Sequence, residues 1–318
     1  MSPRPSLFEN ALRVESVTKR FGTFTAVDRV SFEVRPGQIC GFIGPNGAGK
    51  TTTMRIAATL ELPDDGDVFV CGSSVLVNPR EVRRDLGFMP DAYGAYPDTT
   101  VDEYLDFFAR AYQLRGKARK ASLDHVRDFT GLAPLGAKLI DSLSKGMRQR
   151  LCLAKTLLHD PGFLILDEPA AGLDPRARVE LRELVKALAE MGKGVLISSH
   201  ILSELSSLVD SISVIEGGRI QGAGTVEDIL RQLRPHLRVY LRCLAETPLV
   251  ERALLELPGV RGVHPERKGL AFDFDGDQRA LAELIAKLVS LGLAPIEFAP
   301  ETIDLEDVFL SLTEGLVQ

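Results

Sequence analysis

The segment Gly44-Pro-Asn-Gly-Ala-Gly-Lys-Thr51 constrains the fold of this 318-residue chain more than any other feature. It fits the pattern G-x-x-x-x-G-K-[ST], follows the short apolar run 38–43, and precedes a helical pattern over 52–60. In that strand–loop–helix context, backbone N–H groups of the loop and the positive end of the helix converge on phosphate. The sequence therefore predicts a site for ATP or GTP rather than a glycine-rich turn without a ligand.

Two side chains of this loop have distinct roles in such a site. Lys50 is expected to neutralise charge on the outer phosphates, and Thr51 to place its hydroxyl on a magnesium ion that bridges the last two phosphates. The nucleotide-binding residues predicted in this part of the chain are Gly44, Asn46, Gly47, Gly49, Lys50, Thr51 and Thr52.

A second landmark is Leu-Ile-Leu-Asp-Glu at 164–168, an apolar strand that ends in two carboxylates. Ligands of open α/β sheets bind at the carboxyl ends of strands. We expect Asp167 to hold the magnesium shell and Glu168 to polarise a water for attack on the terminal phosphate. An acidic pair of this kind also occurs at helix N-caps, but the phosphate loop upstream favours the catalytic interpretation.

The pattern of the remaining chain predicts an α/β fold around these two landmarks. Alternating residues at 12–17 and 30–34 predict a small antiparallel β-layer before the loop. Short apolar runs at 163–166 and 195–198, with helical spacing between them at 176–191, predict buried parallel strands joined by a crossover. Helical spacing at 101–113 and 117–130 predicts a mainly helical insert.

Beyond Gly224 the pattern changes to that of a second domain. Strand- and helix-like segments occur in the order β-α-β-β-α-β, at 237–243, 248–257, 260–264, 270–274, 278–291 and 295–298. This order is typical of a ferredoxin-like domain, and an amphipathic helix is predicted over 304–313. We therefore expect a nucleotide-binding domain over 10–225, with a helical subdomain at about 92–158, and an α+β accessory domain over 235–318.

Composition excludes several other classes of protein. No apolar run approaches the roughly 20 residues that cross a bilayer, and the first ten residues lack the features of a signal peptide. A cytosolic location is therefore expected. The net charge of −6 argues against nucleic acid as a partner. The four cysteines (Cys40, Cys71, Cys152 and Cys243) are far apart in the sequence, which is typical of reduced, buried thiols rather than disulfides or a metal site.

The segment Leu143-Ser-Lys-Gly-Met-Arg-Gln-Arg150 resembles the Leu-Ser-Gly-Gly-Gln signature of ATP-binding cassette (ABC) proteins, and the resemblance covers residues 10 to 225. It implies that two cassettes pair head to tail around two ATP molecules, with Ser144 and Gly146 contacting the nucleotide held by the other subunit. Ser144 also fits a simple cap of the helix predicted over 145–158. Lys145 and Met147 depart from the family pattern.

The same resemblance implies roles for four further residues. Phe21 is similar to the aromatic residue that stacks on adenine, although an edge-strand core position also fits. Asp174 resembles the loop residue that links two cassettes, and equally fits a helix cap. His200 resembles the histidine that contacts the terminal phosphate and the attacking water, while a histidine at a strand end is commonly only a satisfied polar residue. Asp91 occupies the place of a glutamine that touches magnesium and relays to a membrane partner.

The second domain resembles the C-terminal extension found on ATPase subunits of bacterial drug- and polysaccharide-type exporters. Taken together, these resemblances imply the ATPase subunit of a bacterial ABC exporter. The resemblance implies ATP and Mg²⁺ as ligands, a head-to-tail homodimer, and a separate transmembrane permease that holds the subunit at the cytoplasmic face of the membrane. Two alternatives remain open at this point. One is a soluble ABC ATPase acting on ribosomes or DNA, and the other is a regulatory cassette in a heterodimer.

Overall fold

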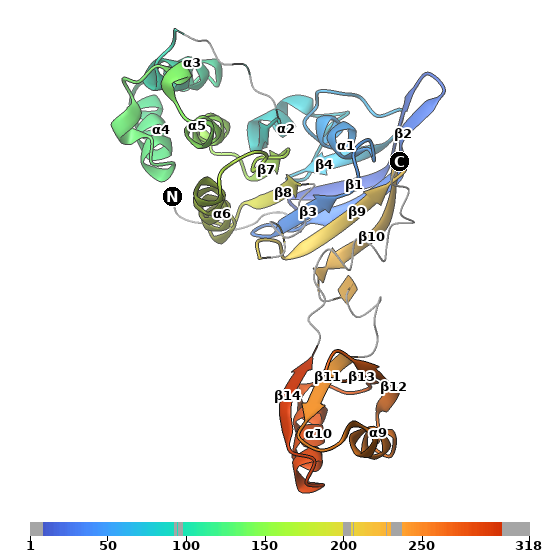
Figure 1. Cartoon of the computed structure of the whole chain (residues 1–318). Coiled ribbons are helices and arrows are strands. Elements are labelled where there is room, and N and C mark those ends of the chain that lie inside the picture. The colour runs from blue at the N-terminus through green and yellow to red at the C-terminus, as the bar shows by residue number, and fades with distance from the viewer. Residues whose placement is uncertain are drawn as a thin grey trace. The chain divides into compact units, whose positions relative to one another are not determined.

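The computed structural model of the chain describes residues 9–91, 94, 98–199, 205, 207–226, 228–229 and 237–300. Contacts among the described residues divide the chain into two compact units, with the boundary after Val226. Figure 1 shows the two units, coloured from blue at the N-terminus to red at the C-terminus.

An antiparallel sheet opens the first unit, as the alternating sequence predicts. Its strand order is β2-β1-β4-β5, and its strands are β1 (Leu12–Phe21), β2 (Phe24–Val34), β4 (Asp65–Val70) and β5 (Ser73–Ser74). Alternate side chains of β2, such as Val30, Phe32 and Val34, are buried because one face of the sheet packs on the core.

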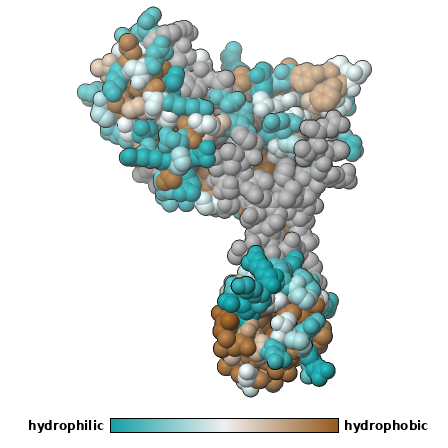
Figure 2. Space-filling model, viewed as in Figure 1, coloured by the Kyte–Doolittle hydropathy of each residue, from teal (hydrophilic) through white to brown (hydrophobic). Residues whose placement is uncertain are grey.

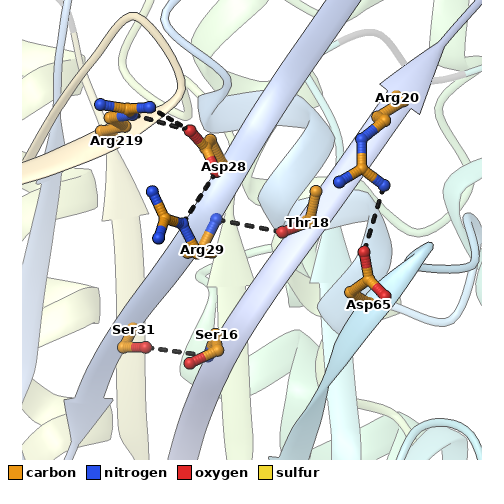
Figure 3. A network of polar contacts seen from close by, with 8 residues as sticks. All are labelled: Ser16, Thr18, Arg20, Asp28, Arg29, Ser31, Asp65 and Arg219. Atoms are coloured by element: carbon orange, nitrogen blue, oxygen red, sulfur yellow. Dashed lines mark hydrogen bonds and ion pairs between the residues drawn. The ribbon is translucent and has the colours of Figure 1, made fainter.

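Polar contacts fix the irregular register of this sheet (Figure 3). The β1–β2 register shifts between Val14 and Val17, and Ser16 in this interval has a positive φ of 47°. Its N–H donates to Ser31 Oγ at 2.8 Å, which compensates for the interrupted ladder. Figure 3 also shows Asp28 of β2 paired with Arg219 across a distance of 2.6 Å.

The second sheet forms the centre of the unit, with the order β10-β9-β3-β8-β7-β6. The parallel strands are β3 (Ile39–Ile43), β6 (Leu86–Met89), β7 (Phe163–Leu166), β8 (Gly194–Ser198) and β9 (Ser211–Glu216), and β10 (Arg219–Thr225) runs antiparallel to β9. Every residue of β3, β7 and β8 is buried, and α6 (Pro175–Glu190) joins β7 to β8. The predicted crossover is therefore confirmed.

One hydrophobic core lies between the two sheets. The rings of Phe32 in the antiparallel sheet and Phe42 in β3 stack with centroids 5.0 Å apart. Helix α1 (Lys50–Ala57) follows β3 and buries Met54 and Ile56 in the same core. The sequence predicts this helix over 52–60, but it ends at Ala57 because Thr59 adopts a left-handed φ of 58°.

A helical region lies between β6 and β7. It consists of α3 (Val101–Ala111), α4 (Gly116–Phe129), two 3₁₀ turns (Ala133–Leu135 and Ile140–Ser142) and α5 (Lys145–Leu157), while α2 (Pro79–Asp85) precedes β6. Thr100 and Glu103 form a capping box that fixes the start of α3. Ser144 caps α5 by accepting a hydrogen bond from the N–H of Met147 at 3.3 Å.

The second unit has the predicted ferredoxin-like order. It contains β11 (Leu237–Cys243), α9 (Thr247–Leu255), β12 (Val260–Glu266), β13 (Gly269–Phe274), α10 (Gln278–Ser290) and β14 (Pro295–Pro300), in an antiparallel sheet of order β12-β13-β11-β14. Its own core includes Val239, Leu254 and Phe272. Figure 2 shows that hydrophobic residues also form much of its visible surface. The helix predicted over 304–313 lies outside the described residues.

Candidate functional site

The glycine-rich loop between β3 and α1 is shaped by contacts that admit no side chain at two positions. A Cβ on Gly44 would collide with the carbonyl oxygen of Ile215 in β9. Gly49 has a φ of 106°, and a Cβ there would lie 2.5 Å from the carbonyl oxygen of Ala26. The backbone thus turns tightly and leads into α1, whose first turn carries no acidic residue. This arrangement favours binding of an anion at the loop.

Lys50, the first residue of α1, is only 7% exposed. Its Nζ donates hydrogen bonds to the carbonyl oxygens of Gly44 at 2.6 Å and Pro45 at 3.0 Å. Burial lowers the pKa of its ammonium, whereas the charges of Glu168 and Asp167 raise it. The cation is therefore held over the loop, where phosphate oxygens can replace the two carbonyl oxygens.

The two carboxylates after β7 are positioned by β8 and β6. Ser198, at the end of β8, donates from Oγ to Asp167 Oδ1 at 2.7 Å and accepts from the N–H of Glu168 at 2.9 Å. The N–H of Asp167 donates to the carbonyl oxygen of Met89 at 2.9 Å. Burial raises the pKa of the Asp167 carboxyl, hydrogen bonds from Ser198 and Thr51 lower it, and the charges of Glu168 and Asp91 raise it again. Asp167 is thus a desolvated carboxylate among other acids, a setting that favours a bound cation.

A pocket of about 550 Å³ contains most of the predicted nucleotide-site residues. Its lining comprises Phe21, Phe24, Ala26, Asn46, Gly47, Gly49, Lys50, Thr51, Thr52, Asp91, Asp167, Glu168 and Ala171. Gly44 lies behind this surface as a buried residue of the loop. Oxygen donors from Thr51, Asp91 and Asp167 meet in this pocket, and they are of the kind that Mg²⁺ prefers. Within the part of the chain that the structure describes, no group of three or more His, Cys, Asp or Glu residues is arranged to hold a metal ion by itself, in this pocket or elsewhere.

Aromatic side chains form one end of the pocket. Phe21 and Phe24, on either side of the β1–β2 turn, are 49% and 62% exposed. Lys19 Nζ lies 5.3 Å from the ring centroid of Phe21 and is itself held by Glu61 at 3.0 Å. Phe21 is therefore an exposed ring and not a core residue, so its surroundings fit a base-stacking surface.

Three other predicted site residues do not line this pocket. Ser144 and Gly146 are at the start of α5, and Asp174 caps α6 by accepting from the N–H of Ala177 at 2.9 Å. Both predicted capping roles are therefore present, irrespective of any further role. The ammonium of Lys145 lies against Gly172. His200 lies outside the described residues.

Three residues of this region were missed by sequence reasoning. Ser198 bridges Asp167 and Glu168, Gln149 donates from Nε2 to the carbonyl oxygen of Pro169 at 2.6 Å, and Phe24 adds a second exposed ring. Their residue types are common at strand ends and in helices. Only the position of Phe24, three residues after Phe21, offered a signal in the sequence.

Fold and site together define a nucleotide-binding ATPase of the cassette class. The family model "ABC transporter" matches residues 27–171. A solved structure titled "Structure of ATP binding subunit of ABC transporter" is similar, with a TM-score of 0.64 and 31% identity over 70% of this chain and 92% of that chain.

Curated relatives extend the similarity to nearly the whole chain. The Nod factor export ATP-binding protein I of Ralstonia nicotianae is 32% identical, with 95% of this chain and 93% of that protein covered. The daunorubicin resistance ATP-binding protein DrrA3 of Streptomyces coeruleorubidus is 33% identical, with 96% of each chain covered. The probable multidrug ABC transporter ATP-binding protein YbhF of Escherichia coli is 35% identical over 70% of this chain. The match covers only 39% of the length of YbhF.

The chain belongs to the ATP-binding proteins of the ABC transporter family. The predicted ATP-binding ATPase cassette is thereby confirmed, and the relatives support a transporter subunit over an ATPase acting on ribosomes or DNA. Among the described residues, every helix is too short or too polar to cross a lipid bilayer. The four cysteines, all of them among the described residues, form no disulfide.

Proposed function

We propose that this chain hydrolyses Mg-ATP as a head-to-tail homodimer and drives export through a separate transmembrane permease. The observation that carries the proposal is the pocket in which Lys50, Asp167 and Glu168 meet beside a phosphate loop. Relatives similar over almost the full length are named as export and resistance ATP-binding proteins, which supports export as the direction of transport.

Within the pocket, each polar group has a role that follows from its surroundings. Lys50 stabilises charge on the transferred phosphoryl group, because its ammonium is already desolvated and aimed at the loop. Glu168 orients and polarises the attacking water. Thr51, Asp167 and Asp91 would hold Mg²⁺, which neutralises charge on the phosphate oxygens when bound. His200 is assigned to the terminal phosphate and the water by its resemblance to the family histidine.

The homodimer explains why part of the predicted site is missing from the pocket. Ser144 and Gly146 begin a 13-residue helix whose N-terminal N–H groups suit a phosphate, yet they do not line the pocket of their own chain. A second copy, reversed relative to the first, would bring its Ser144 end to the nucleotide and place Asp174 at the contact between cassettes.

We assign residues 10–225 to the nucleotide-binding domain, with its helical subdomain at about 92–158, and residues 235–318 to the accessory domain. The division of contacts at Val226 supports this boundary. Association with the permease would hold the protein at the cytoplasmic face of the membrane. A regulatory cassette that does not hydrolyse ATP is the remaining alternative, and the presence of both Lys50 and Glu168 argues against it.

Replacement of the proposed base tests both dimer and partner. The Glu168→Gln protein should bind Mg-ATP, hydrolyse it poorly and elute as a dimer in size-exclusion chromatography, while Lys50→Ala should remain monomeric because it binds nucleotide weakly. Affinity capture of Glu168→Gln from detergent-solubilised cells should then recover a polytopic membrane protein in near-equal amount. A monomer at saturating Mg-ATP would contradict the dimer. Recovery of ribosomal or DNA-repair proteins without a membrane partner would contradict the transport role.

A further inference from the structure

The backbone at Glu168 adopts a conformation that its sequence disfavours. Its φ is 50°, in the left-handed region that residues other than glycine rarely occupy, and the next residue is Pro169. A residue before proline normally takes an extended conformation, because the proline ring crowds its backbone. Strain of this kind persists only where surrounding contacts over-determine the geometry.

Two side chains from different elements hold this strained turn, one on each side. Ser198 Oγ of β8 accepts from the N–H of Glu168 at 2.9 Å. Gln149 of α5 donates from Nε2 to the carbonyl oxygen of Pro169 at 2.6 Å. Gln149 is 5% exposed and Pro169 is buried, so this carbonyl group depends on a protein donor rather than on bulk water. Glu168 is thus fixed between the core sheet and α5.

Helix α5 is closely attached to the segment that follows Glu168. A Cβ on Gly146 would lie 2.8 Å from Cβ of Ala177 in α6, so the two helices are in tight contact at their N-terminal ends. The ammonium of Lys145 lies against Gly172, which is between Glu168 and Asp174 in the sequence. Motion of the start of α5 therefore acts on the 169–174 segment through the Gln149 hydrogen bond and the Lys145–Gly172 contact, and on the start of α6 through the Gly146–Ala177 contact.

We propose that Gln149 is a positioning residue for hydrolysis, which holds Glu168 in its strained conformation through the carbonyl group of Pro169. Because Gln149 lies five residues after Ser144 on the same helix, it also couples the Ser144 end of α5 to the carboxylate of its own chain. Phosphate bound at the start of α5 in one nucleotide site then changes the position of Glu168, which belongs to the other nucleotide site of the dimer. This inference rests on the proposed function of Glu168 and of the head-to-tail dimer.

The role depends on a donor and not on volume, and two variants separate these properties. Gln149→Leu fills similar space without a donor, and Gln149→Met keeps the unbranched shape of the side chain, also without a donor for the carbonyl oxygen. Thr156→Val is the matched control. Thr156 is 1% exposed on the same helix, and its Oγ1 donates to the carbonyl oxygen of Cys152 within α5 at 2.8 Å, so its loss weakens α5 without touching Pro169.

We expect both Gln149 variants to lower kcat about tenfold, the effect of leaving one buried carbonyl group unpaired, with KM for ATP changed less than about twofold. Thr156→Val should keep the wild-type kcat even if its Tm falls by as much as the Tm of the Gln149 variants. Equal kcat in Gln149→Met and wild type would overturn the proposal. A kcat loss that Thr156→Val reproduces at the same Tm would also overturn it. Should Gln149→Leu fail to fold, Gln149→Met, which is close to glutamine in length and shape, supplies the same comparison.

Dimer formation separates failure of this inference from failure of the proposed function. In the Glu168→Gln background, adding Gln149→Leu should leave the Mg-ATP-dependent dimer intact, because the positioning acts after nucleotide is bound. A dimer that forms with Glu168→Gln alone but not with the double variant would overturn the positioning role and assign Gln149 to assembly. If Glu168→Gln alone forms no dimer, the head-to-tail arrangement is wrong and the coupling between sites is refuted with it. The comparison of kcat between the wild type and the Gln149 variants still tests whether Gln149 positions Glu168.

Discussion

The hydroxyl of Ser198 offers the sharpest test of how the acidic pair is held. Ser198 is fully buried, and it donates to Asp167 Oδ1 at 2.7 Å while accepting from Glu168 N–H at 2.9 Å. Ser198→Ala removes both bonds and leaves the N–H of Glu168 without this acceptor. Loss of its partner costs a buried polar group about 1–3 kcal/mol, and this hydrogen bond is partly buried. If the transition state loses about 2 kcal/mol of stabilisation in this way, kcat falls about 30-fold.

A second effect of Ser198→Ala follows from the pKa of Asp167. Burial already raises this pKa, and the hydrogen bond from Ser198 opposes the rise. Removing the bond raises the pKa further, so Asp167 takes up its proton at a higher pH on acidification. The acid limb of the pH profile of kcat should therefore move to higher pH, because a protonated Asp167 is a poor ligand for Mg²⁺.

The assay is steady-state phosphate release at saturating Mg-ATP across the pH range, with Tm measured in parallel. Ser213→Ala is the control, since Ser213 is a buried hydroxyl of the same sheet whose contact is the thiol of Cys40 at 3.8 Å. A Ser198→Ala protein with kcat within about twofold of wild type and an unmoved acid limb would refute this account of the site.

Three further predictions concern the loop, the buried acid and the thiols. Gly49→Ala should abolish ATP binding in calorimetry, because its Cβ would lie 2.5 Å from the Ala26 carbonyl oxygen at a φ of 106°. Asp167→Asn should raise the Tm of the nucleotide-free protein at pH 7.5 by about 2–4 °C, the effect of about 1 kcal/mol, while removing stabilisation by Mg-ATP in thermal shift. Burial raises the pKa of the Cys40 thiol to about 11, so at pH 8 Cys243, which is partly exposed, should react with maleimide before Cys40.

The sign of the Asp167 prediction follows from linkage. A folded-state pKa above the unfolded value gives stability that is present at low pH and lost as pH rises through the folded pKa. The advantage of the Asn variant should therefore disappear in acid, and an advantage that grows on acidification would contradict the assignment. Gly47→Ala separates backbone strain from collision, since Gly47 also has a positive φ, 79°, but a Cβ there has nothing within 4 Å, so it should weaken ATP binding less than Gly49→Ala. Equal labelling of Cys40 and Cys243, read by mass spectrometry of the folded protein, would contradict the burial of Cys40.

Much of the fold follows from local patterns in the sequence. Buried parallel strands such as β7 are short continuous apolar runs, and the caps Thr100 and Ser144 mark where α3 and α5 begin. Helix α1 ends earlier than the sequence predicts, because the left-handed conformation that ends it is at Thr59 and not at a glycine, the residue that usually indicates such a turn. The order of elements in the second unit was also predictable, since hydrophobic period and turn residues alternate clearly there.

The phosphate loop could be predicted from the sequence, because the glycines, the lysine and the threonine of its motif lie within eight consecutive residues and a backbone turn is a local property. It also placed two carboxylates at a strand end. How those carboxylates are held depends on contacts between residues far apart in the sequence. Ser198 lies 30 residues from Glu168, and Gln149 lies 20 residues from Pro169. Contacts at such separations depend on the side-chain packing of β7, β8 and α5, which no hydrophobic period or motif spacing specifies.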